Sequence, residues 1–281
     1  PLTAAEQNQQ AGLFVSALLA GRLRPELRSA RLPDPSVLVG QVVAGGFPEA
    51  VKRPADRART WHRQYLRALL ERDVQDVARV RDPRELARLL ELLALRTAQL
   101  LNVATLTSEL GLRRETVERY LAICERLFLV RRLPAWHHNH ATRLIKAPKI
   151  HFVDSGLAAT LSSFTSGDVL DNRTQFGHLL ESFAVQQLIA QAGWTAPELV
   201  FSHYRDKDQV EVDLVMERGR DVWGVEVKAA ATVTPSDGAG LRRLADRCGR
   251  HFRGGVLLYG GTATVSLSVK GCLGVPLARL W

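Results

Sequence analysis

The sequence is poor in cysteine and has no long apolar run. Both features limit the classes of protein to which the chain can belong. Its three cysteines, Cys124, Cys248 and Cys272, are far apart and form no Cys-x-x-Cys pair. This spacing favours neither a disulfide framework nor a zinc site, so we expect buried, reduced thiols. No stretch approaches the ~20 apolar residues of a membrane-spanning helix, and the first residues lack the basic and apolar regions of a signal peptide. We therefore expect a cytoplasmic protein without a membrane partner.

The sequence also lacks an initiator methionine and any Gly-x-x-x-x-Gly-Lys-Ser/Thr loop. The missing loop predicts that this stretch does not bind ATP through a P-loop. What is present is an ordinary globular composition, with 281 residues, 46% hydrophobic and 24% charged, which is enough for two small domains or one large one. We expect a helical lead-in over 1–51, a helical and winged-helix domain over 52–160, and an α/β domain over 170–281.

Positive charge is in excess and is unevenly spread. The formal net charge is +9, and residues 52–132 hold 18 Lys and Arg against 11 Asp and Glu, an excess of seven. A polyanion such as nucleic acid is the natural partner of such a stretch. The same arginines are equally compatible with the solvated faces of amphipathic helices. The location of the charge in the fold has to distinguish nucleic-acid binding from this alternative.

The basic middle of the chain has the pattern of a winged helix-turn-helix, with a glycine turn at Gly111 between two helices. The expected elements are helices over 57–80, 82–101, 103–112 and 113–128 and β-prone runs over 128–133 and 149–154. A segment rich in His, Asn, Arg and Lys joins the two β-prone runs. We interpret its His137, His138 and His140 as a wing tip rather than metal ligands, since no cysteine or carboxylate stands close in sequence.

Arg113, Arg114 and Arg119 lie on the second helix of this motif, where they can meet phosphates or base edges. DNA binding is therefore one interpretation. The other is a protein-interaction module, because many winged-helix domains bind only proteins and because Glu115 and Glu118 on the same helix would repel a phosphate backbone.

The last hundred residues change character and predict an α/β domain of order αβββαβ, so that the whole chain is α+β. The expected elements are a helix over 176–191, strands near 199–204, 210–216 and 222–228, a helix over 237–248 and a strand over 255–259. Glu181, on the first helix, has small and apolar neighbours one turn away and needs a partner for its carboxylate.

Carboxylates concentrate on the second and third of these strands. Alternation separates Asp213 from Val212 and Leu214, and likewise separates Glu226 and Lys228 from the valines between them. A hairpin turn near Gly219 makes opposed residue numbers sum to 439, which places Asp213 opposite Glu226 and Glu211 opposite Lys228.

Like charges directly opposed on a sheet are unfavourable and ask for a cation, and Mg²⁺ or Mn²⁺ would resolve the repulsion. A metal held by Asp213 and Glu226, with Glu181 nearby, would activate water for phosphodiester hydrolysis, while Lys228 orients water or neutralises the transition state. The alternative is structural: Glu211 and Lys228 form a cross-strand pair, and the other two carboxylates lie on a solvated face.

Asp213, Glu226-x-Lys228 and the upstream Glu181 together resemble the motif of the PD-(D/E)xK nuclease superfamily. All four positions of that motif are filled in this sequence. The resemblance implies that these residues are catalytic, that the three carboxylates bind the metal, and that the C-terminal domain has a restriction-endonuclease-like fold.

A longer series of segments resembles the C-terminal portion of the bacterial and archaeal AAA-type ATPases that carry a DUF4143 domain, and it covers nearly the whole chain. The segments are Gly45-Gly46-Phe47-Pro48, Tyr65–Asp73, Leu106–Tyr120, Lys149–Leu157, Phe176–Phe183 and Glu211–Lys228. This resemblance implies a winged helix followed by the nuclease-like domain. It also implies a P-loop ATPase module before Pro1, so that ATP is a ligand of the parent protein and not of this stretch.

Three functions follow from these observations. The first is the DNA-engaging half of an ATPase–nuclease, with a metal-dependent site at Glu181, Asp213, Glu226 and Lys228. The second is a non-catalytic module that binds nucleic acid or protein for the ATPase. The third is an assembly element whose basic face contacts the ATPase module or other copies of the chain.

Overall fold

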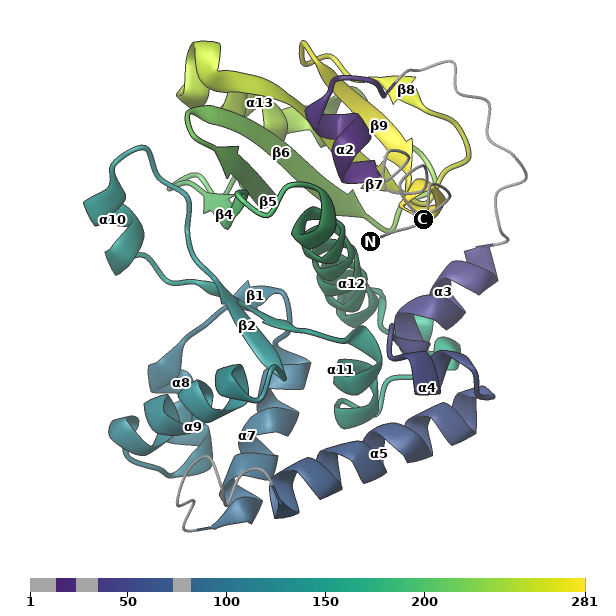
Figure 1. The fold of residues 1–281 in the computed structure, drawn as a ribbon, viewed down its shortest axis with the longest axis vertical. Coiled ribbons are helices and arrows are strands. Elements are labelled where there is room, and N and C mark those ends of the chain that lie inside the picture. The colour runs from purple at the N-terminus through teal and green to yellow at the C-terminus, as the bar shows by residue number, and fades with distance from the viewer. Residues whose placement is uncertain (1–13, 24–34, 73–81, 281) are drawn as a thin grey trace, which may run out of the picture. The chain divides into compact units, whose positions relative to one another are not determined.

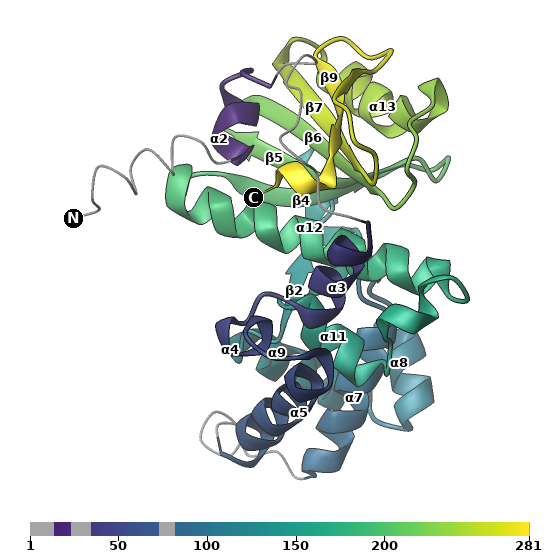
Figure 2. The same cartoon turned by 90° about the vertical axis from the view of Figure 1, so that its right-hand side faces the viewer.

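The computed structural model describes residues 14–23, 35–72 and 82–280. The chain forms two compact units, each built from separate stretches (Figures 1 and 2). Unit 1 combines described residues of 1–35, 134–146 and 184–281, and unit 2 combines those of 36–133 and 147–183. Helix α12, Arg173–Thr195, contributes residues to both units. No helix within the described ranges is both long and apolar enough to cross a membrane.

Unit 2 is mostly helical, and local sequence signals explain where its helices begin and end. Asp82 accepts a hydrogen bond from Arg84 N at 2.8 Å and caps a helix that starts with Pro83. Asn102 caps the next helix, and Gly111 ends it in the left-handed conformation. The helices are α3 (Pro35–Ala44), α4 (Pro48–Val51), α5 (Ala55–Glu71), α7 (Pro83–Leu95), α8 (Val103–Leu110), α9 (Arg114–Arg126), α11 (Ser155–Leu161) and the 3-10 helix η1 (Ser166–Val169).

One predicted helix differs from the structure at its end, and two further predictions can be compared only in part. The helix predicted over 82–101 ends at Leu95, because Ala98 adopts a left-handed conformation and donates its N–H to Ile150 O. The helix predicted over 57–80 is described only to residue 72, and the helical lead-in expected over 1–51 is described only from Phe14, where it begins with α2 (Phe14–Leu19) in unit 1. The remainder of both predictions lies outside the described residues.

A small antiparallel sheet completes unit 2 in the described part of the chain. Its strands are β1 (Gln99–Leu100), β2 (Val130–Leu133) and β3 (Lys149–Phe152), in the order β1-β3-β2. Val130 lies opposite Phe152, and Leu133 lies opposite Lys149. The predicted succession of helix, glycine turn, helix and two paired strands is thus present, and β1 is an addition that the sequence pattern did not indicate.

The segment between β2 and β3 belongs to unit 1. Trp136 N donates to His203 O at 2.5 Å, and His203 N donates to Pro134 O at 2.9 Å, so residues 134–136 lie along an edge strand of unit 1. The segment then forms α10 (His140–Ile145). The histidines interpreted as a wing tip therefore follow a stretch that covers a sheet edge, where unpaired backbone groups offer hydrogen bonds.

Within the described residues, unit 1 contains a mixed six-stranded sheet. Its strand order is β4-β5-β6-β7-β9-β8. The first three strands are antiparallel neighbours, whereas β6–β7 and β7–β9 are parallel. The strands are β4 (Val200–Arg205), β5 (Glu211–Arg218), β6 (Asp221–Lys228), β7 (Phe252–Tyr259), β8 (Val265–Ser266) and β9 (Cys272–Pro276). With α12 before β4 and α13 (Ala239–Cys248) between β6 and β7, the predicted αβββαβ order is observed, and β8 and β9 extend it.

The hairpin of β5 and β6 has the predicted register. Leu214 lies opposite Val225 and Arg218 opposite Asp221, so opposed numbers sum to 439. The other edge of β5 is irregular: Ser202 and Tyr204, two residues apart on β4, pair with Val215 and Val212, which are three apart. Strand β5 therefore carries an extra residue between Val212 and Val215, and Asp213 lies in this β-bulge.

The bulge alters which side chains of β5 form the core of unit 1. Val212 and Val215 belong to one buried cluster, together with Leu241 and Leu244 of α13. Strict alternation would have sent these two valines to opposite faces, so the predicted alternation does not hold through the bulge.

The three cysteines are free thiols. Cys124 and Cys272 are buried, as expected, and Cys248 is half-buried. Burial raises the pKa of each thiol to about 12, so none is a reactive thiolate at neutral pH.

Candidate functional site

Asp213 reaches from the bulge of β5 to the backbone of β6. Its Oδ2 accepts a hydrogen bond from Val227 N at 2.9 Å. The recorded pairing of β5 with β6 runs from Leu214 to Arg218, so this bond joins the two strands just beyond their regular ladder. The bulge thus directs the half-buried carboxylate of Asp213 toward the neighbouring strand.

Glu226 lies on β6 and is only 8% exposed. Its Oε1 accepts a hydrogen bond from Leu241 N at 2.7 Å, at the start of α13. Gly240 makes this approach possible, because a Cβ at that position would lie 2.3 Å from Glu226 Oε1 and 2.0 Å from Glu211 O. Any residue with a side chain at position 240 would force the helix away from the strand.

The surroundings of Glu226 favour its protonated form. Burial, and then the neighbouring Asp213 carboxylate, raise the pKa of Glu226 from 4.5 to about 8, although the Leu241 N–H and the Lys228 ammonium oppose the shift. The carboxyl group of Glu226 is therefore mostly protonated and uncharged at neutral pH. A divalent cation between the two carboxyl groups would displace the proton, because metal ligands must be deprotonated.

Lys228 follows Glu226 by two residues on β6 and so lies on the same side of the strand. Its ammonium forms an ion pair with Asp237 Oδ1. Asp237 Oδ2 also accepts hydrogen bonds from Thr234 N at 2.7 Å and from Thr234 Oγ1 at 2.8 Å. The bond from Lys228, followed by those from Thr234, lowers the pKa of Asp237 to about 2.

Asp237 is a member of this cluster that the sequence analysis missed. Thr234-Pro-Ser-Asp237 has the Ser/Thr-x-x-Asp/Glu spacing of a helix start, and it precedes α13 through the 3-10 helix η2 (Pro235–Gly238). That spacing was the available signal. It predicts a local turn and gives no indication that the carboxylate returns to Lys228, nine residues earlier.

Glu211 and Lys228, which the register places opposite one another, each form an ion pair with another residue. Glu211 Oε1 lies 2.5 Å from Arg205 Nη1 on β4. Lys228 binds Asp237. Each residue of the structural alternative, the cross-strand pair of Glu211 and Lys228, thus has an ion-pair partner other than the residue opposite it.

Glu181 belongs to the portion of α12 that is part of unit 2. Its Oε1 lies 2.8 Å from Lys149 Nζ and 4.0 Å from His151 Nε2, and both partners come from β3. His151 Nδ1 is in turn 2.9 Å from Ser182 Oγ. The expected partner of this carboxylate is therefore a buried lysine on the small sheet, in a polar network that the sequence did not reveal.

Within the described residues, no group of three or more His, Cys, Asp and Glu side chains is arranged to hold a metal ion. Asp213 and Glu226 supply two carboxylates. Mg²⁺ usually keeps several waters and is bound through one or two protein carboxylates plus the phosphates of a substrate. The pair therefore fits a hydrated Mg²⁺ or Mn²⁺ that is shared with a phosphate, and it does not form a closed protein cage.

The arginines predicted to meet nucleic acid are all exposed, at the start and in the first half of α9. Arg113 precedes the helix, Arg114 lies 3.7 Å from Glu118, and Arg119 lies over the ring of Tyr120. Glu118 is also 3.7 Å from Arg132, so its charge is offset by two guanidinium groups. The expected repulsion between Glu118 and a phosphate backbone is correspondingly reduced.

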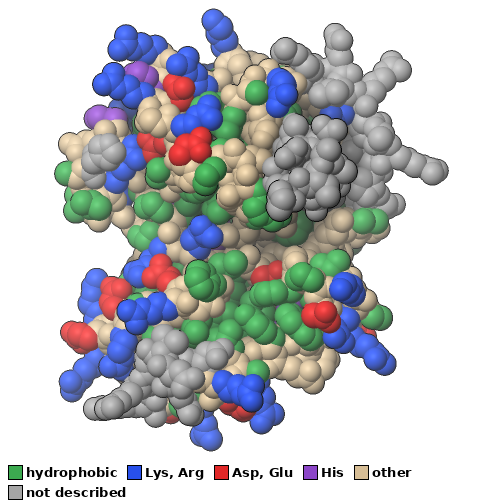
Figure 3. Space-filling view, in the orientation of Figure 1, with side chains coloured by type: hydrophobic (Ala, Val, Ile, Leu, Met, Phe, Trp, Pro, Cys, Tyr) green, Lys and Arg blue, Asp and Glu red, His purple; other side chains and the backbone are tan. Residues whose placement is uncertain are grey.

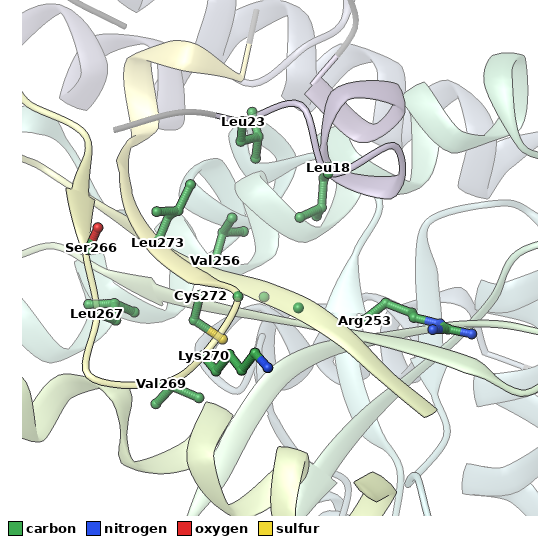
Figure 4. Close-up of a pocket in the computed structure, with 14 residues that line it drawn as sticks. Leu18, Leu23, Arg253, Val256, Ser266, Leu267, Val269, Lys270, Cys272 and Leu273 are labelled. Atoms are coloured by element: carbon green, nitrogen blue, oxygen red, sulfur yellow. The ribbon is translucent and has the colours of Figure 1, made fainter. Parts of the chain in front are cut away.

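Unit 1 also contains a cavity of about 380 Å³ between α2 and strands β7 and β9 (Figure 4). Leu18 of α2, Val256 of β7 and Leu273 of β9 are among the residues that line it. Asp213, Glu226 and Lys228 are not among its lining residues, so this cavity is not part of the candidate site.

Two family models match the chain. One, a domain of unknown function named DUF8612, matches residues 37–168, and the other, a domain of unknown function named DUF4143, matches residues 176–280. Residues 176–280 form a DUF4143 domain. This part of the earlier resemblance is confirmed, and the domain contains Glu181, Asp213, Glu226 and Lys228.

The curated relatives are themselves uncharacterized. One protein of Mycobacterium tuberculosis and one of Mycobacterium bovis are each 30% identical to this chain over 200 residues, which is 70% of the chain and 44% of either relative. The chain thus spans less than half the length of these relatives. No solved structure matches it.

Proposed function

We propose that the DUF4143 domain hydrolyses phosphodiester bonds of nucleic acid with a divalent metal, and that the chain is the nucleic-acid-engaging part of a larger AAA-type ATPase. The observation that supports the catalytic proposal most directly is the neighbouring pair of Asp213 and Glu226. One of these carboxyl groups is buried and has a pKa of about 8, so a divalent cation would relieve a repulsion that the fold itself maintains.

Each residue of the cluster has a role in this proposal. Asp213 and Glu226 would hold Mg²⁺ or Mn²⁺, which when bound acidifies a water and stabilises charge on the phosphoryl group. Lys228 presents its ammonium on the same side of β6 as Glu226, where it would neutralise charge that develops on the scissile phosphate. Asp237 fixes the position of Lys228 through their ion pair.

The third predicted carboxylate, Glu181, stays a prediction of the superfamily resemblance. Its ion pair with Lys149 is internal to unit 2. Glu181 can bind a metal only if its carboxylate leaves Lys149 or contacts both partners. Glu181→Gln is therefore a test separate from the substitutions of Asp213 and Glu226 in unit 1.

The nucleic-acid part of the proposal rests on α9 and its exposed Arg113, Arg114 and Arg119. Duplex DNA is the substrate that we propose, because the helix–glycine turn–helix arrangement presents these side chains from the helix that enters the major groove in helix-turn-helix proteins. The proposal assigns the ATPase module, its ATP and contacts with further subunits to a longer parent protein. The curated relatives are long enough for such a module, because this chain covers 44% of their length.

A non-catalytic binding module is the second candidate. It is favoured by the absence, in the described ranges, of a group of three metal-binding side chains, and by the protonated state of Glu226 at neutral pH. This candidate predicts that Lys228→Ala changes neither metal binding nor any activity. An assembly element, the third function, predicts self-association that is insensitive to salt and no affinity for DNA.

The test is calorimetric titration with Mg²⁺ and Mn²⁺ at pH 6.5, 7.5 and 8.5, together with cleavage of plasmid and branched DNA. We expect affinity for the metal to rise with pH through the pKa of Glu226, with proton release that varies with the buffer. Asp213→Asn and Glu226→Gln should abolish binding and cleavage, and Lys228→Ala should abolish cleavage with binding retained. Glu211→Gln, on the same sheet but paired with Arg205, is the matched control. If the wild type binds no metal at any of these pH values, the catalytic proposal is wrong.

A further inference from the structure

Helix α10 carries two large aliphatic side chains that project into solvent. Leu144 is 88% exposed and Ile145 is 84% exposed. They are consecutive, so the helix ends in a small apolar tip formed by these two residues. Adjacent exposed aliphatic side chains on a short protruding element are typical of a contact with another molecule.

The tip is held firmly by the rest of unit 1. Arg143, the residue before Leu144, forms a two-pronged ion pair with Glu217 of β5, with distances of 2.5 and 2.8 Å, and its guanidinium also lies over the ring of Trp136. Trp136 packs edge-on against Tyr204 of β4. Asn139 caps the helix through a 2.9 Å bond from Ala141 N. These contacts fix the orientation of a helix that is too short to be stable alone.

Four cationic or titratable side chains lie near α10 or follow it, and we name them the basic collar: His137 and His138 before the helix, Lys146 directly after Ile145, and Arg247 of α13. Arg143 Nε donates a hydrogen bond to His137 O, and Lys146 Nζ donates one to Arg205 O at 3.3 Å. The rings of His137 and His138 are 4.2 Å apart. The pKa of His137 is lowered by burial and then by the positive charges of His138, Lys146 and Arg247. In Figure 3, histidine side chains lie among those of Lys and Arg beside exposed hydrophobic side chains.

We propose that α10 is a wedge for duplex DNA, in which Leu144 and Ile145 insert at a base step while the basic collar binds the flanking phosphates. Proteins that unstack DNA combine these two features, with aliphatic side chains between base steps and cations on the backbone. The positive charge of the collar favours a polyanionic partner for the tip. The wedge rests on the proposed function, since it assumes that unit 1 works on nucleic acid.

The test measures unstacking in the absence of metal, so that cleavage plays no part. A duplex that carries 2-aminopurine at a central step is titrated with the whole chain in EDTA, and its fluorescence and the binding affinity are followed at several salt concentrations. We expect the fluorescence to rise on binding. Leu144→Ser/Ile145→Ser should abolish that rise and weaken binding at least threefold, whereas Leu170→Ser, a matched control at 77% exposure in unit 2, should change neither.

Collar variants supply the electrostatic test. Lys146→Ala and Arg247→Ala should each lower the slope of log affinity against log salt by about 0.9, the value for one phosphate contact on duplex DNA. Lys270→Ala, an exposed lysine on the rim of the cavity in Figure 4, is the charge-matched control and should leave the slope unchanged.

The outcomes separate the wedge from the proposed function. Binding without a fluorescence rise, or a rise that survives Leu144→Ser/Ile145→Ser, overturns the wedge, and if the same protein cleaves DNA with Mg²⁺ the nuclease proposal stands. A rise that depends on the tip, with no cleavage under any metal, supports the wedge and defeats the nuclease proposal. If the tip variant abolishes self-association in sedimentation runs and has no effect on DNA, α10 is a protein contact and the wedge is wrong.

Discussion

Replacing Glu226 by glutamine should make the protein more stable at alkaline pH in the absence of metal. The folded protein keeps the proton of Glu226 up to a pKa of about 8, whereas the unfolded chain loses it near 4.5. Between these values the unfolded state binds fewer protons than the folded state. The free energy of unfolding of the wild type therefore falls as the pH rises through that window, by about 1.4 kcal/mol per pH unit for this one group.

The size of the effect follows from the same shift. Between a pH below 4.5 and a pH above 8, the wild type loses roughly 3–5 kcal/mol of its free energy of unfolding through Glu226. This is a large part of the stability of a typical domain. Glutamine keeps an oxygen that accepts the bond from Leu241 N and has no proton to lose. Glu226→Gln should thus resemble the wild type near pH 5 and exceed its stability by roughly 3–5 kcal/mol near pH 9.

The assay is urea unfolding followed by circular dichroism at unit steps from pH 5 to pH 9 in EDTA. All other titrating groups are shared, so the difference between the wild type and Glu226→Gln isolates the one carboxyl. Glu211→Gln controls for the loss of any carboxylate from this sheet. A difference between wild type and Glu226→Gln that is constant across the pH range would refute the assigned pKa and the reasoning built on it.

Three further substitutions test individual contacts. Gly240→Ala places a methyl group against Glu226 Oε1 and should cost roughly 1–3 kcal/mol of stability in urea unfolding, with loss of metal binding. Asp237→Asn weakens the anchor of Lys228 and should slow DNA cleavage at saturating metal while calorimetric affinity for the metal is retained; a lower affinity would place Asp237 among the ligands instead. Asp154→Ala removes the acceptor of Gly46 N at 2.6 Å and of Leu157 N at 2.9 Å and should cost roughly 2–4 kcal/mol in urea unfolding of unit 2.

The sequence was sufficient to predict those parts of the structure that depend on neighbours along the chain. The β5–β6 hairpin is the clearest case, because a tight turn at Gly219 fixes the register of every following pair. Helix starts at Asp82 and Asn102 and the glycine stop at Gly111 depend on side chains within three residues. The order of elements in the DUF4143 domain follows from the same local signals.

Features that depend on distant partners were not predictable in this way. The bulge at Asp213 appears only once β4 is paired with β5, since an extra residue in one strand leaves no mark on that strand alone. The Lys149–Glu181 pair joins residues 32 apart, and the return of Asp237 to Lys228 depends on the start of α13. Residues 134–146 leave unit 2 and cover the edge of β4, a course that hydrophobic period alone does not indicate.

The carboxylate pair and the basic collar are linked through one rigid element, helix α13. Its first turn is held by Glu226 through Leu241 N, and Arg247 of the collar follows six residues later, roughly 9 Å along the helix axis. Substitutions at about that separation usually add unless the two sites share partners, so a non-additive double variant of Glu226 and Arg247 would show that α13 couples them. Leu144 and Ile145, in contrast, are anchored through Arg143 to Glu217 of β5. The tip variant replaces only two exposed side chains, so it tests DNA unstacking without removing a buried contact. The double variant of Glu226 and Arg247 measures how strongly the protonation or metal occupancy of the carboxylate pair affects phosphate binding by the collar.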